Sequence, residues 1–241
     1  MIVVPDKFVF VHLPRCGGTF IADAIWKFFP SARQIGYHLP WTLLPSEYSQ
    51  LPVLGAVRNP WEFYVSWYHH VWPRDAETPL ISWVTDNGKH GFAGSTRNAL
   101  NFAADNDRLD RLIELVPEEV DYNRKHIPNI TKEALRKARG TGVGYFTFRF
   151  NHLFGNAKNI SFCRQEALRE DLINFFDRLS ILSNGLSEYV LGSEKKNTAE
   201  YVHYSTYYTP ELAELVKVRD RLLIEKFGYT FERSLETQSK I

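Results

Sequence analysis

The sequence predicts an α/β fold in which a parallel β-sheet is flanked by helices, with a helix-rich middle. Three times along the chain a short apolar run, typical of a buried strand, is followed by a segment with helical periodicity. Strands that alternate with helices favour parallel pairing, because the crossover helix returns the chain to the same end of the sheet. The chain has 241 residues and no visible linker or repeat, so we expect one domain, 1–241.

The first predicted strand covers residues 7–13, where β-forming residues make an unbroken apolar run. A helix follows over 20–29, since apolar residues recur there with helical spacing, and Pro30 ends it. A short strand over 33–35 is expected next. This strand, turn and helix at the start of the chain set the expected parallel topology.

The second strand is predicted over 51–57, and the helix after it has a clear start signal. Asn59 serves as the N-cap, Pro60 is the first helical residue and Glu62 stands in the first turn. We expect this helix to end about two residues before Pro73.

The rest of the chain is predicted to be mostly helical. Residues 81–139 are polar and helical without clear boundaries, and a strand over 159–163 is followed by a helix over 165–179. Thr209 caps a last helix that Gly228 ends.

Composition excludes several classes of protein. With 44% hydrophobic and 24% charged residues the chain is globular rather than disordered. A net charge of +1 argues against a nucleic-acid partner or a polybasic membrane binder. The two cysteines, Cys16 and Cys163, exclude a disulfide scaffold and a four-cysteine zinc site, and we expect no metal. Without a membrane-spanning run or a signal peptide, we expect a cytoplasmic protein.

The first candidate site is the segment from residue 12 to residue 20, His-Leu-Pro-Arg-Cys-Gly-Gly-Thr-Phe. It lies between a predicted strand and a predicted helix, where backbone N–H groups and the helix dipole favour an anion. Gly17 and Gly18 allow a close approach of a phosphate. Arg15 adds a charged donor and Thr19 a hydroxyl. The alternative is an ordinary strand-to-helix turn; the combination favours a phosphate site.

This segment is not the usual triphosphate loop, Gly-x-x-x-x-Gly-Lys-Ser/Thr. No glycine stands at the required distance before Gly17, and Thr19 follows a glycine instead of a lysine. A kinase or GTPase is therefore disfavoured. Cys16, near a helix N-terminus, could have a lowered thiol pKa and a redox role, but a small residue in a tight loop is the favoured interpretation.

The second candidate site is Val57-Arg58-Asn59-Pro60-Trp61-Glu62 with Ser66. Arg58 ends a predicted strand and Ser66 stands in the next helix. The ends of parallel strands gather at one edge of a sheet, where ligands bind, so we expect a second phosphate near Arg15. The alternative is an Arg58 that pairs with an acid and a Ser66 that is simply buried.

Together the two segments resemble the sulfotransferases that use 3′-phosphoadenosine 5′-phosphosulfate (PAPS). Residues 14–19 resemble their 5′-phosphosulfate loop, and 58–66 resemble their 3′-phosphate motif. Residues 207–211 and 227–229 resemble the ending of the carbohydrate-type members. The resemblance implies a P-loop nucleotide-binding fold and transfer of a sulfuryl group from PAPS to an acceptor hydroxyl, with a sugar or glycolipid among the candidate acceptors.

The resemblance also implies roles for residues. The cofactor-binding set is Arg15, Cys16, Gly17, Gly18, Thr19, Phe20, Arg58, Ser66, Lys195 and Lys196. Arg15 stands where the family usually has a lysine at the leaving phosphate; arginine keeps the charge but cannot give up a proton. Phe20 is expected either to stack on adenine or to pack in the core. Lys195 and Lys196 are expected either to close over the 3′-phosphate or to be solvated charges.

Transfer to a hydroxyl needs a general base, and His38 is the leading candidate. It follows the first helix, in a region where related carbohydrate sulfotransferases place a catalytic His or Glu. The alternative is that His38 only packs beside Trp41. His12, His69, His70 and Glu62 are the reserve candidates.

Two other functions stay open on the sequence alone. The first is an ATP-dependent small-molecule kinase with a variant loop, which a metal requirement would support. The second is a non-catalytic nucleotide-binding protein, which Arg15 in the usual lysine position leaves open.

Overall fold

A computed structural model describes residues 1–124, 129–194 and 201–234. Contacts group the chain into two compact units, each assembled from three segments. We call the first the sheet unit: Met1–Arg58, Asp121–Asn129 and Phe150–Thr198. We call the second the helical unit: Asn59–Val120, Ile130–Arg149 and Ala199–Ile241. That the chain forms a single domain stays a prediction.

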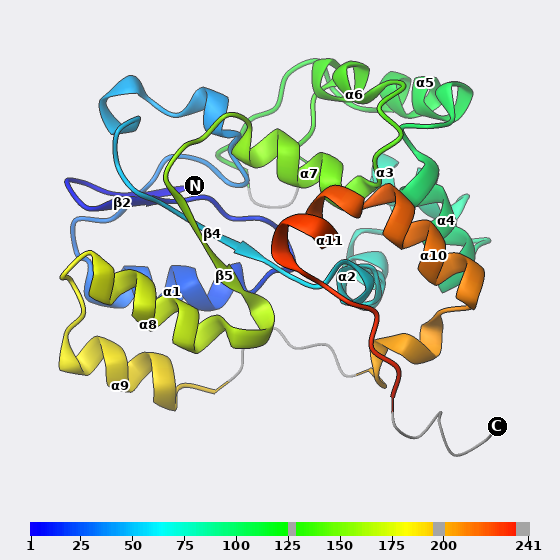
Figure 1. The fold of residues 1–241 in the computed structure, drawn as a ribbon. Coiled ribbons are helices and arrows are strands. Elements are labelled where there is room, and N and C mark those ends of the chain that lie inside the picture. The colour runs from blue at the N-terminus through cyan, green and yellow to red at the C-terminus, as the bar shows by residue number, and fades with distance from the viewer. Residues whose placement is uncertain (125–128, 195–200, 235–241) are drawn as a thin grey trace. The chain divides into compact units, whose positions relative to one another are not determined.

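The sheet unit contains a mixed five-stranded sheet of order β3-β1-β2-β4-β5 in the described residues. The strands are β1 (Ile2–Val4), β2 (Phe8–Phe10), β3 (Arg33–Gln34), β4 (Val53–Val57) and β5 (Ile160–Arg164). β2, β4 and β5 run parallel, and β1 pairs antiparallel with both β2 and β3. Figure 1 shows β2, β4 and β5 crossing the sheet unit.

The prediction of an α/β fold is confirmed, and parallel pairing is confirmed for β2, β4 and β5. The other end of the sheet differs from the prediction, because β1 was not expected. β1 is a three-residue apolar strand that returns antiparallel along β2 after a tight turn, in which Asp6 has a φ of 60° and Lys7 N donates to Val4 O. A strand this short gives no alternating pattern in the sequence.

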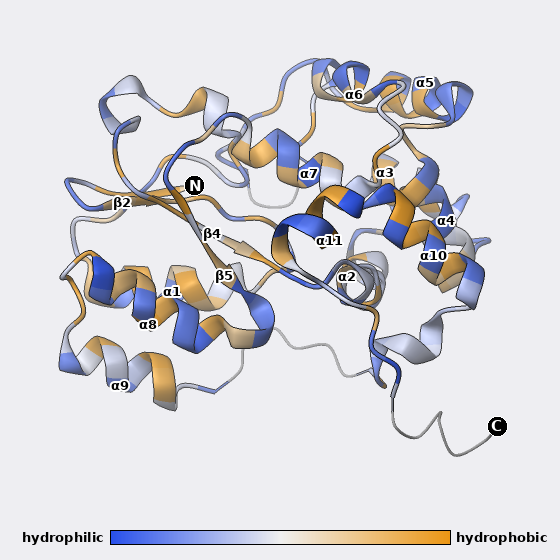
Figure 2. Cartoon of the chain, in the orientation of Figure 1, coloured by the Kyte–Doolittle hydropathy of each residue, from blue (hydrophilic) through white to orange (hydrophobic). Residues whose placement is uncertain are grey.

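Helices of the sheet unit bury the strands. They are α1 (Gly18–Phe28), α8 (Leu168–Arg178) and α9 (Asn184–Gly192), and the last residues of α7 (Tyr145–Phe154) join them. Phe8 of β2 contacts Phe29, Phe175 and Phe176, with ring centroids 5.3–5.9 Å apart. Figure 2 shows the consequence: hydrophobic residues along β2 and β4, and mixed residues along α8.

The helical unit contains α2 (Pro60–Asp75), α3 (Pro79–Thr85), α4 (Phe92–Asn101), α5 (Asn106–Leu115), α6 (Lys132–Ala138), α10 (Pro210–Arg219) and α11 (Arg221–Phe227). It also contains the short 3₁₀ helix η4 (Tyr204–Tyr207), while the 3₁₀ helices η1 (Trp41–Leu43), η2 (Ser46–Tyr48) and η3 (Gln165–Ala167) belong to the sheet unit. The predicted caps are confirmed. Asn59 accepts from Trp61 N at 3.0 Å, Thr209 accepts from Leu212 N at 3.3 Å, and Gly228 ends α11 with a φ of 66°.

The predicted end of α2 is wrong, because the helix continues through Pro73 to Asp75. A proline inside a helix removes one hydrogen bond but does not forbid the next turn. Trp72 packs edge-on against Tyr68, one turn earlier, with ring centroids 4.2 Å apart, and this contact favours the extra turn.

The single last helix of the prediction is two helices, α10 and α11, which meet at Asp220. Asp220 is fully buried, and its carboxylate explains the break. It accepts hydrogen bonds from Tyr64 Oη at 2.8 Å, from Thr147 N at 2.9 Å and from Thr147 Oγ1 at 2.7 Å. Burial raises the pKa of Asp220 from 3.8 to about 6, against the lowering effect of these hydrogen bonds.

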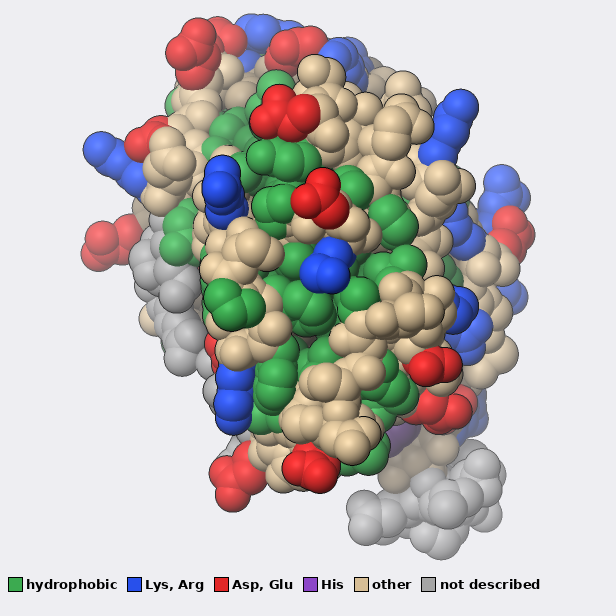
Figure 3. All heavy atoms as spheres, turned by 90° about the vertical axis from the view of Figure 1, so that its left-hand side faces the viewer, with side chains coloured by type: hydrophobic (Ala, Val, Ile, Leu, Met, Phe, Trp, Pro, Cys, Tyr) green, Lys and Arg blue, Asp and Glu red, His purple; other side chains and the backbone are tan. Residues whose placement is uncertain are grey.

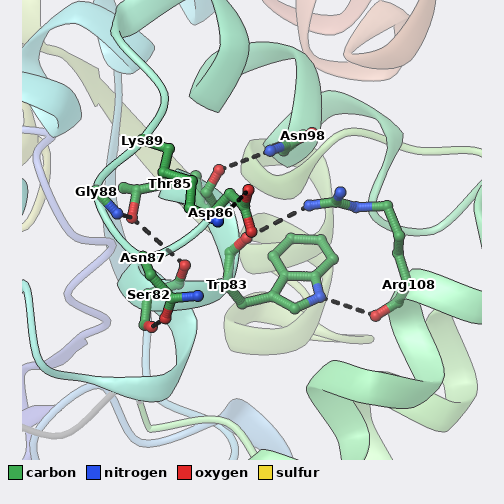
Figure 4. A network of polar contacts seen from close by, with 10 residues as sticks. Ser82, Trp83, Thr85, Asp86, Asn87, Gly88, Lys89, Asn98 and Arg108 are labelled. Carbon is green, nitrogen blue, oxygen red and sulfur yellow. Dashed lines mark hydrogen bonds and ion pairs between the residues drawn. The ribbon is translucent and has the colours of Figure 1, made fainter.

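A polar network joins α3 to α4 and α5 (Figure 4). Trp83 Nε1 donates to Arg108 O at 2.8 Å, and the Arg108 guanidinium returns a bond to Trp83 O at 3.3 Å. Asn98 of α4 donates to Val84 O at 2.8 Å. These bonds satisfy carbonyls at the end of α3, so a short helix of seven residues is held at its C-terminus by two neighbours.

The surface is mixed. Figure 3 shows one face on which hydrophobic side chains gather near the centre, with charged side chains mostly around them. Trp26, Leu43 and Leu191 are large hydrophobic residues of the sheet unit that are exposed. In the described ranges of the chain, no helix combines the length and the apolar character needed to cross a membrane.

Candidate functional site

The turn between β2 and α1, residues 11–17, carries the first predicted motif. Arg15 and Gly17 both adopt left-handed backbone conformations, with φ of 64° and 81°, and Gly17 is the N-cap of α1. The first N–H groups of a helix have no partner inside the helix, and the helix dipole favours negative charge there. The turn therefore presents a helix start suited to an anion, with Thr19 exposed in the first turn.

Gly17, at the end of the turn, and Gly18, the first residue of α1, also have a packing reason. A Cβ at Gly18 would overlap the His12 imidazole, and a Cβ at Gly17 would lie 2.6 Å from Leu168 Cδ2. His12 in turn stacks on Phe10, with ring centroids 5.7 Å apart. The absence of side chains at Gly17 and Gly18 thus lets His12 and α8 pack against the start of α1. This packing is a second reason for the two glycines, beside the predicted close approach of a phosphate.

Arg58 directly follows β4 and reaches this turn. Its Nη1 donates to Arg15 O at 3.2 Å, although the two residues stand 43 positions apart in the sequence. Arg58 is buried, with 7% of its surface exposed, so its charge is held in a defined place. Arg15 and Arg58, one residue from each predicted anion-binding motif, are therefore neighbours within the sheet unit.

Cys16 follows Arg15 in the sequence and is fully buried. Burial raises the pKa of its thiol far above the ordinary value. The positive charges of Arg58 and Arg15 lower this pKa, and the negative charge of Glu166 raises it further. A lowered thiol pKa, one of the two sequence interpretations, is therefore wrong: the desolvation of the sulfur outweighs the charges of the two arginines. The tight-loop interpretation agrees with the hydrogen bond from Cys16 Sγ to Pro14 O at 3.4 Å.

His38 lies beside the same turn. Its Nδ1 is 2.8 Å from His12 O, and the two imidazole centroids are 4.8 Å apart. A carbonyl oxygen only accepts, so Nδ1 carries the proton and the lone pair of a neutral His38 is on Nε2. His38 is half-buried and has a left-handed φ of 48°. The structure thus brings the predicted base to the predicted anion loop.

The burial of Phe20 agrees with the interpretation that this residue packs in the core. It is 6% exposed, and the ring of Tyr189 in α9 lies 6.3 Å away at an angle of 8°. The Arg169 guanidinium lies 5.2 Å from the Phe20 ring centroid. These neighbours occupy much of the space around the ring, and stacking on adenine stays a prediction.

Other predicted residues belong to the helical unit or lie outside the described residues. Ser66 belongs to the helical unit, where it is buried in α2 with 1% exposed. Lys195 and Lys196 lie outside the described residues. Of the reserve bases, Glu62 accepts from Tyr201 Oη at 3.4 Å, and His69 stacks on Tyr201 with centroids 5.5 Å apart; both belong to the helical unit.

Glu166 is the residue near the site that sequence reasoning missed. β5 runs parallel to β4 with Arg164 beside Val57, so the segment after β5 begins at the same edge of the sheet as Arg58. The influence of the Glu166 charge on Cys16 agrees with that placement. A signal was present: Glu166 follows the third predicted strand closely, as Arg58 follows the second.

Among the described residues, no group of three or more His, Cys, Asp and Glu side chains could hold a metal ion. Comparison with models of known protein families finds no match for this chain, and comparison with curated proteins finds none either. The candidate site is therefore defined by its own residues: Arg15, Gly17, Gly18, Thr19, His38 and Arg58.

Proposed function

We propose that the protein is a PAPS-dependent sulfotransferase that transfers a sulfuryl group to a hydroxyl of its acceptor. The observation that carries this proposal is the hydrogen bond from Arg58 Nη1 to Arg15 O. It joins the two motifs whose sequences resemble the 5′-phosphosulfate and 3′-phosphate sites of that family. The Arg58 guanidinium reaches the turn before α1, and Arg15 adds a second positive charge that acts on Cys16 there, which suits a ligand with several anionic groups.

The residues of the turn fit such a nucleotide. Gly17 and Gly18 leave the start of α1 without a side chain, and no acidic residue stands in the first turn of this fully described helix. Arg15, Thr19 and the first N–H groups of α1 would hold the 5′ group, and Arg58 would hold the 3′-phosphate. Ser66, Lys195 and Lys196 stay predictions from the sequence resemblance.

The chain's own residues then supply the acid–base and charge requirements. When bound, PAPS supplies the sulfuryl group. His38 Nε2 takes the proton of the acceptor hydroxyl while the oxygen bonds to sulfur and the bond from sulfur to the phosphate oxygen breaks. Arg15 stabilises the negative charge that remains on that phosphate. Because an arginine does not give up its proton, Arg15 acts by charge and hydrogen bonding alone.

The acceptor is a molecule with a free hydroxyl. The likeness of residues 207–211 and 227–229 to the carbohydrate-type ending favours a sugar or a glycolipid. A general base beside the phosphate site is needed for a sugar hydroxyl, whose pKa is far above neutrality, and His38 meets this requirement in the sheet unit.

Calorimetry tests the cofactor. Adenosine 3′,5′-bisphosphate should bind far more tightly than adenosine 5′-monophosphate or ATP with Mg²⁺. Arg58→Ala should weaken bisphosphate binding by about 1.5–3 kcal/mol, or roughly 10- to 150-fold in Kd, because a charge-assisted contact is lost. Arg33→Ala, at an exposed arginine on β3, is the matched control. Equal affinity for the two adenosine phosphates would contradict the Arg58 assignment.

Transfer is tested with ³⁵S-labelled PAPS and a panel of sugars, glycolipids and small alcohols. Labelled product from at least one acceptor is expected, and it should form without added Mg²⁺. Phosphate transfer from ATP in the presence of Mg²⁺ would support the kinase alternative instead. Tight bisphosphate binding with no transfer to any acceptor would support a non-catalytic nucleotide-binding protein.

A further inference from the structure

The turn that carries His38 is fastened to the edge of the sheet. Ile35 N donates to Met1 O at 3.1 Å, and Met1 N donates to Gly36 O. These bonds continue the pairing of β1 with β3, so the backbone is fixed up to residue 36. A Cβ at Gly36 would lie 3.1 Å from Leu39 Cβ and 3.2 Å from Tyr122 Cβ, so the chain is also closely packed here.

The next residue is held by a distant segment of the same unit. Tyr37 N donates to Tyr122 O at 2.7 Å, and the Asn129 side-chain amide donates through Nδ2 to Tyr37 O. Asn129 is fully buried and stands 92 positions after Tyr37. Both backbone polar groups of Tyr37, the residue before His38, are therefore bonded to Tyr122 and Asn129. Among the described residues, the segment that contains these two residues is the only part of the predicted helix-rich middle assigned to the sheet unit.

The conformation of His38 itself needs such support. A left-handed backbone is unfavourable for a residue with a Cβ, and it persists where the surroundings impose it. Here the φ of 48° places the ring so that Nδ1 meets His12 O at 2.8 Å. If Tyr37 were released, His38 could relax toward an ordinary backbone and its ring would leave His12 O. Nδ1 would then no longer be fixed as the protonated nitrogen.

We propose that Asn129 is a positioning residue: by holding Tyr37 O it keeps His38 in the left-handed turn, with Nδ1 on His12 O and Nε2 as the proton-accepting nitrogen. The role of His38 as a base rests on the proposed function. The positioning of His38 by Asn129 rests on hydrogen bonds of the sheet unit. It also accounts for Asn129-Ile130-Thr131, which matches the glycosylation pattern: the amide is buried in a hydrogen bond with Tyr37 instead of being open to modification.

Two variants test the inference on the full chain. Asn129→Asp keeps the shape but lacks the N–H donor, and Asn129→Ala removes the side chain, in case a buried carboxylate prevents folding. Asn123→Ala is the matched control, because Asn123 is exposed in the same segment and bonds only to Asp121 among the contacts found for it. His38→Gln identifies the His38 signals by their loss.

The first measurement is ¹⁵N NMR of the imidazoles at pH 8. In the wild type and in Asn123→Ala, His38 should show a protonated Nδ1 and an unprotonated Nε2. In the Asn129 variants the two nitrogens should move toward the averaged shifts of exchanging tautomers. Unchanged His38 shifts in a folded Asn129 variant would overturn the inference, whether or not the protein transfers sulfate.

The second measurement is kinetic, with the acceptor identified in the PAPS panel. The Asn129 variants should lose about 10- to 100-fold in kcat, since a misplaced base reacts poorly, with the Kd of adenosine 3′,5′-bisphosphate within about twofold of wild type. Equal losses of bisphosphate affinity and kcat would indicate a merely structural residue and overturn the inference. Failure of transfer in the wild type would instead refute the proposed function, and the NMR result would stand by itself.

Discussion

Replacing Asp220 by asparagine should change how the stability of the helical unit depends on pH. Burial raises the pKa of this carboxyl from 3.8 to about 6, so the folded state binds the proton more tightly than the unfolded state does. The stabilisation is complete below pH 3.8 and is lost as pH rises through about 6. Asparagine keeps the shape and cannot titrate, so this loss should be absent in the variant.

The size of the effect follows from the two pKa values. A change from 3.8 to about 6, at about 1.4 kcal/mol for each pH unit, gives roughly 3 kcal/mol. Between pH 4 and pH 7 the wild type should lose about 2–3 kcal/mol of unfolding free energy relative to Asp220→Asn. Asp220 is fully buried, so solvent screening does not reduce this value much.

Urea unfolding at several pH values between 4 and 7, followed by tryptophan fluorescence, measures this difference. Four of the six tryptophans report on the helical unit: Trp61, Trp67, Trp72 and Trp83. Asp107→Asn, at an exposed position in the same unit, controls for the loss of a carboxylate. A difference between wild type and Asp220→Asn that stays constant over this pH range would refute the reasoning.

Three further predictions concern the candidate site. Arg15→Ala should lower kcat more than it weakens bisphosphate binding, because charge on the leaving phosphate grows in the transition state; a change in KM alone would disprove this role in steady-state kinetics. His38→Ala should lower turnover by ~10²–10⁴-fold with bisphosphate affinity retained, and an active variant with an unchanged acid limb of its pH–rate profile would remove His38 from the mechanism. Gly18→Ala should weaken bisphosphate binding, measured by calorimetry, because the new Cβ collides with His12, whereas Gly192→Ala has open space and should not.

Local signals in the sequence predicted the helices and strands near the site well. The turn after β2, the cap at Asn59 and the stop at Gly228 are each set by neighbouring residues, and each is confirmed. Features that depend on distant residues were not predictable in this way. The break at Asp220 depends on Tyr64 and Thr147, which are far away in the sequence.

In the candidate site, too, residues with a local signal were predicted and residues that act through distant contacts were not. Arg15 and Arg58 could be found because each stands at a strand end that the sequence marks, and the structure joins them. Asn129 could not be found as a support of His38, since its only sequence signal was a glycosylation pattern. The proposed role comes from the hydrogen bond that Asn129 Nδ2 donates to Tyr37 O over 92 positions, a contact that no local pattern encodes.

The pairing of β4 with β5 has a consequence for the newly made chain. Val57 and Arg164 are neighbours in the sheet but are separated by about a hundred residues of sequence. On the ribosome β4, an entirely apolar strand, therefore waits without this neighbour until residues 160–164 emerge. Closing so long a loop also slows sheet formation. Chains that stop before residue 160 should consequently expose the unpaired hydrogen-bonding edge of β4 and aggregate, whereas in full-length chains β5 pairs with this edge.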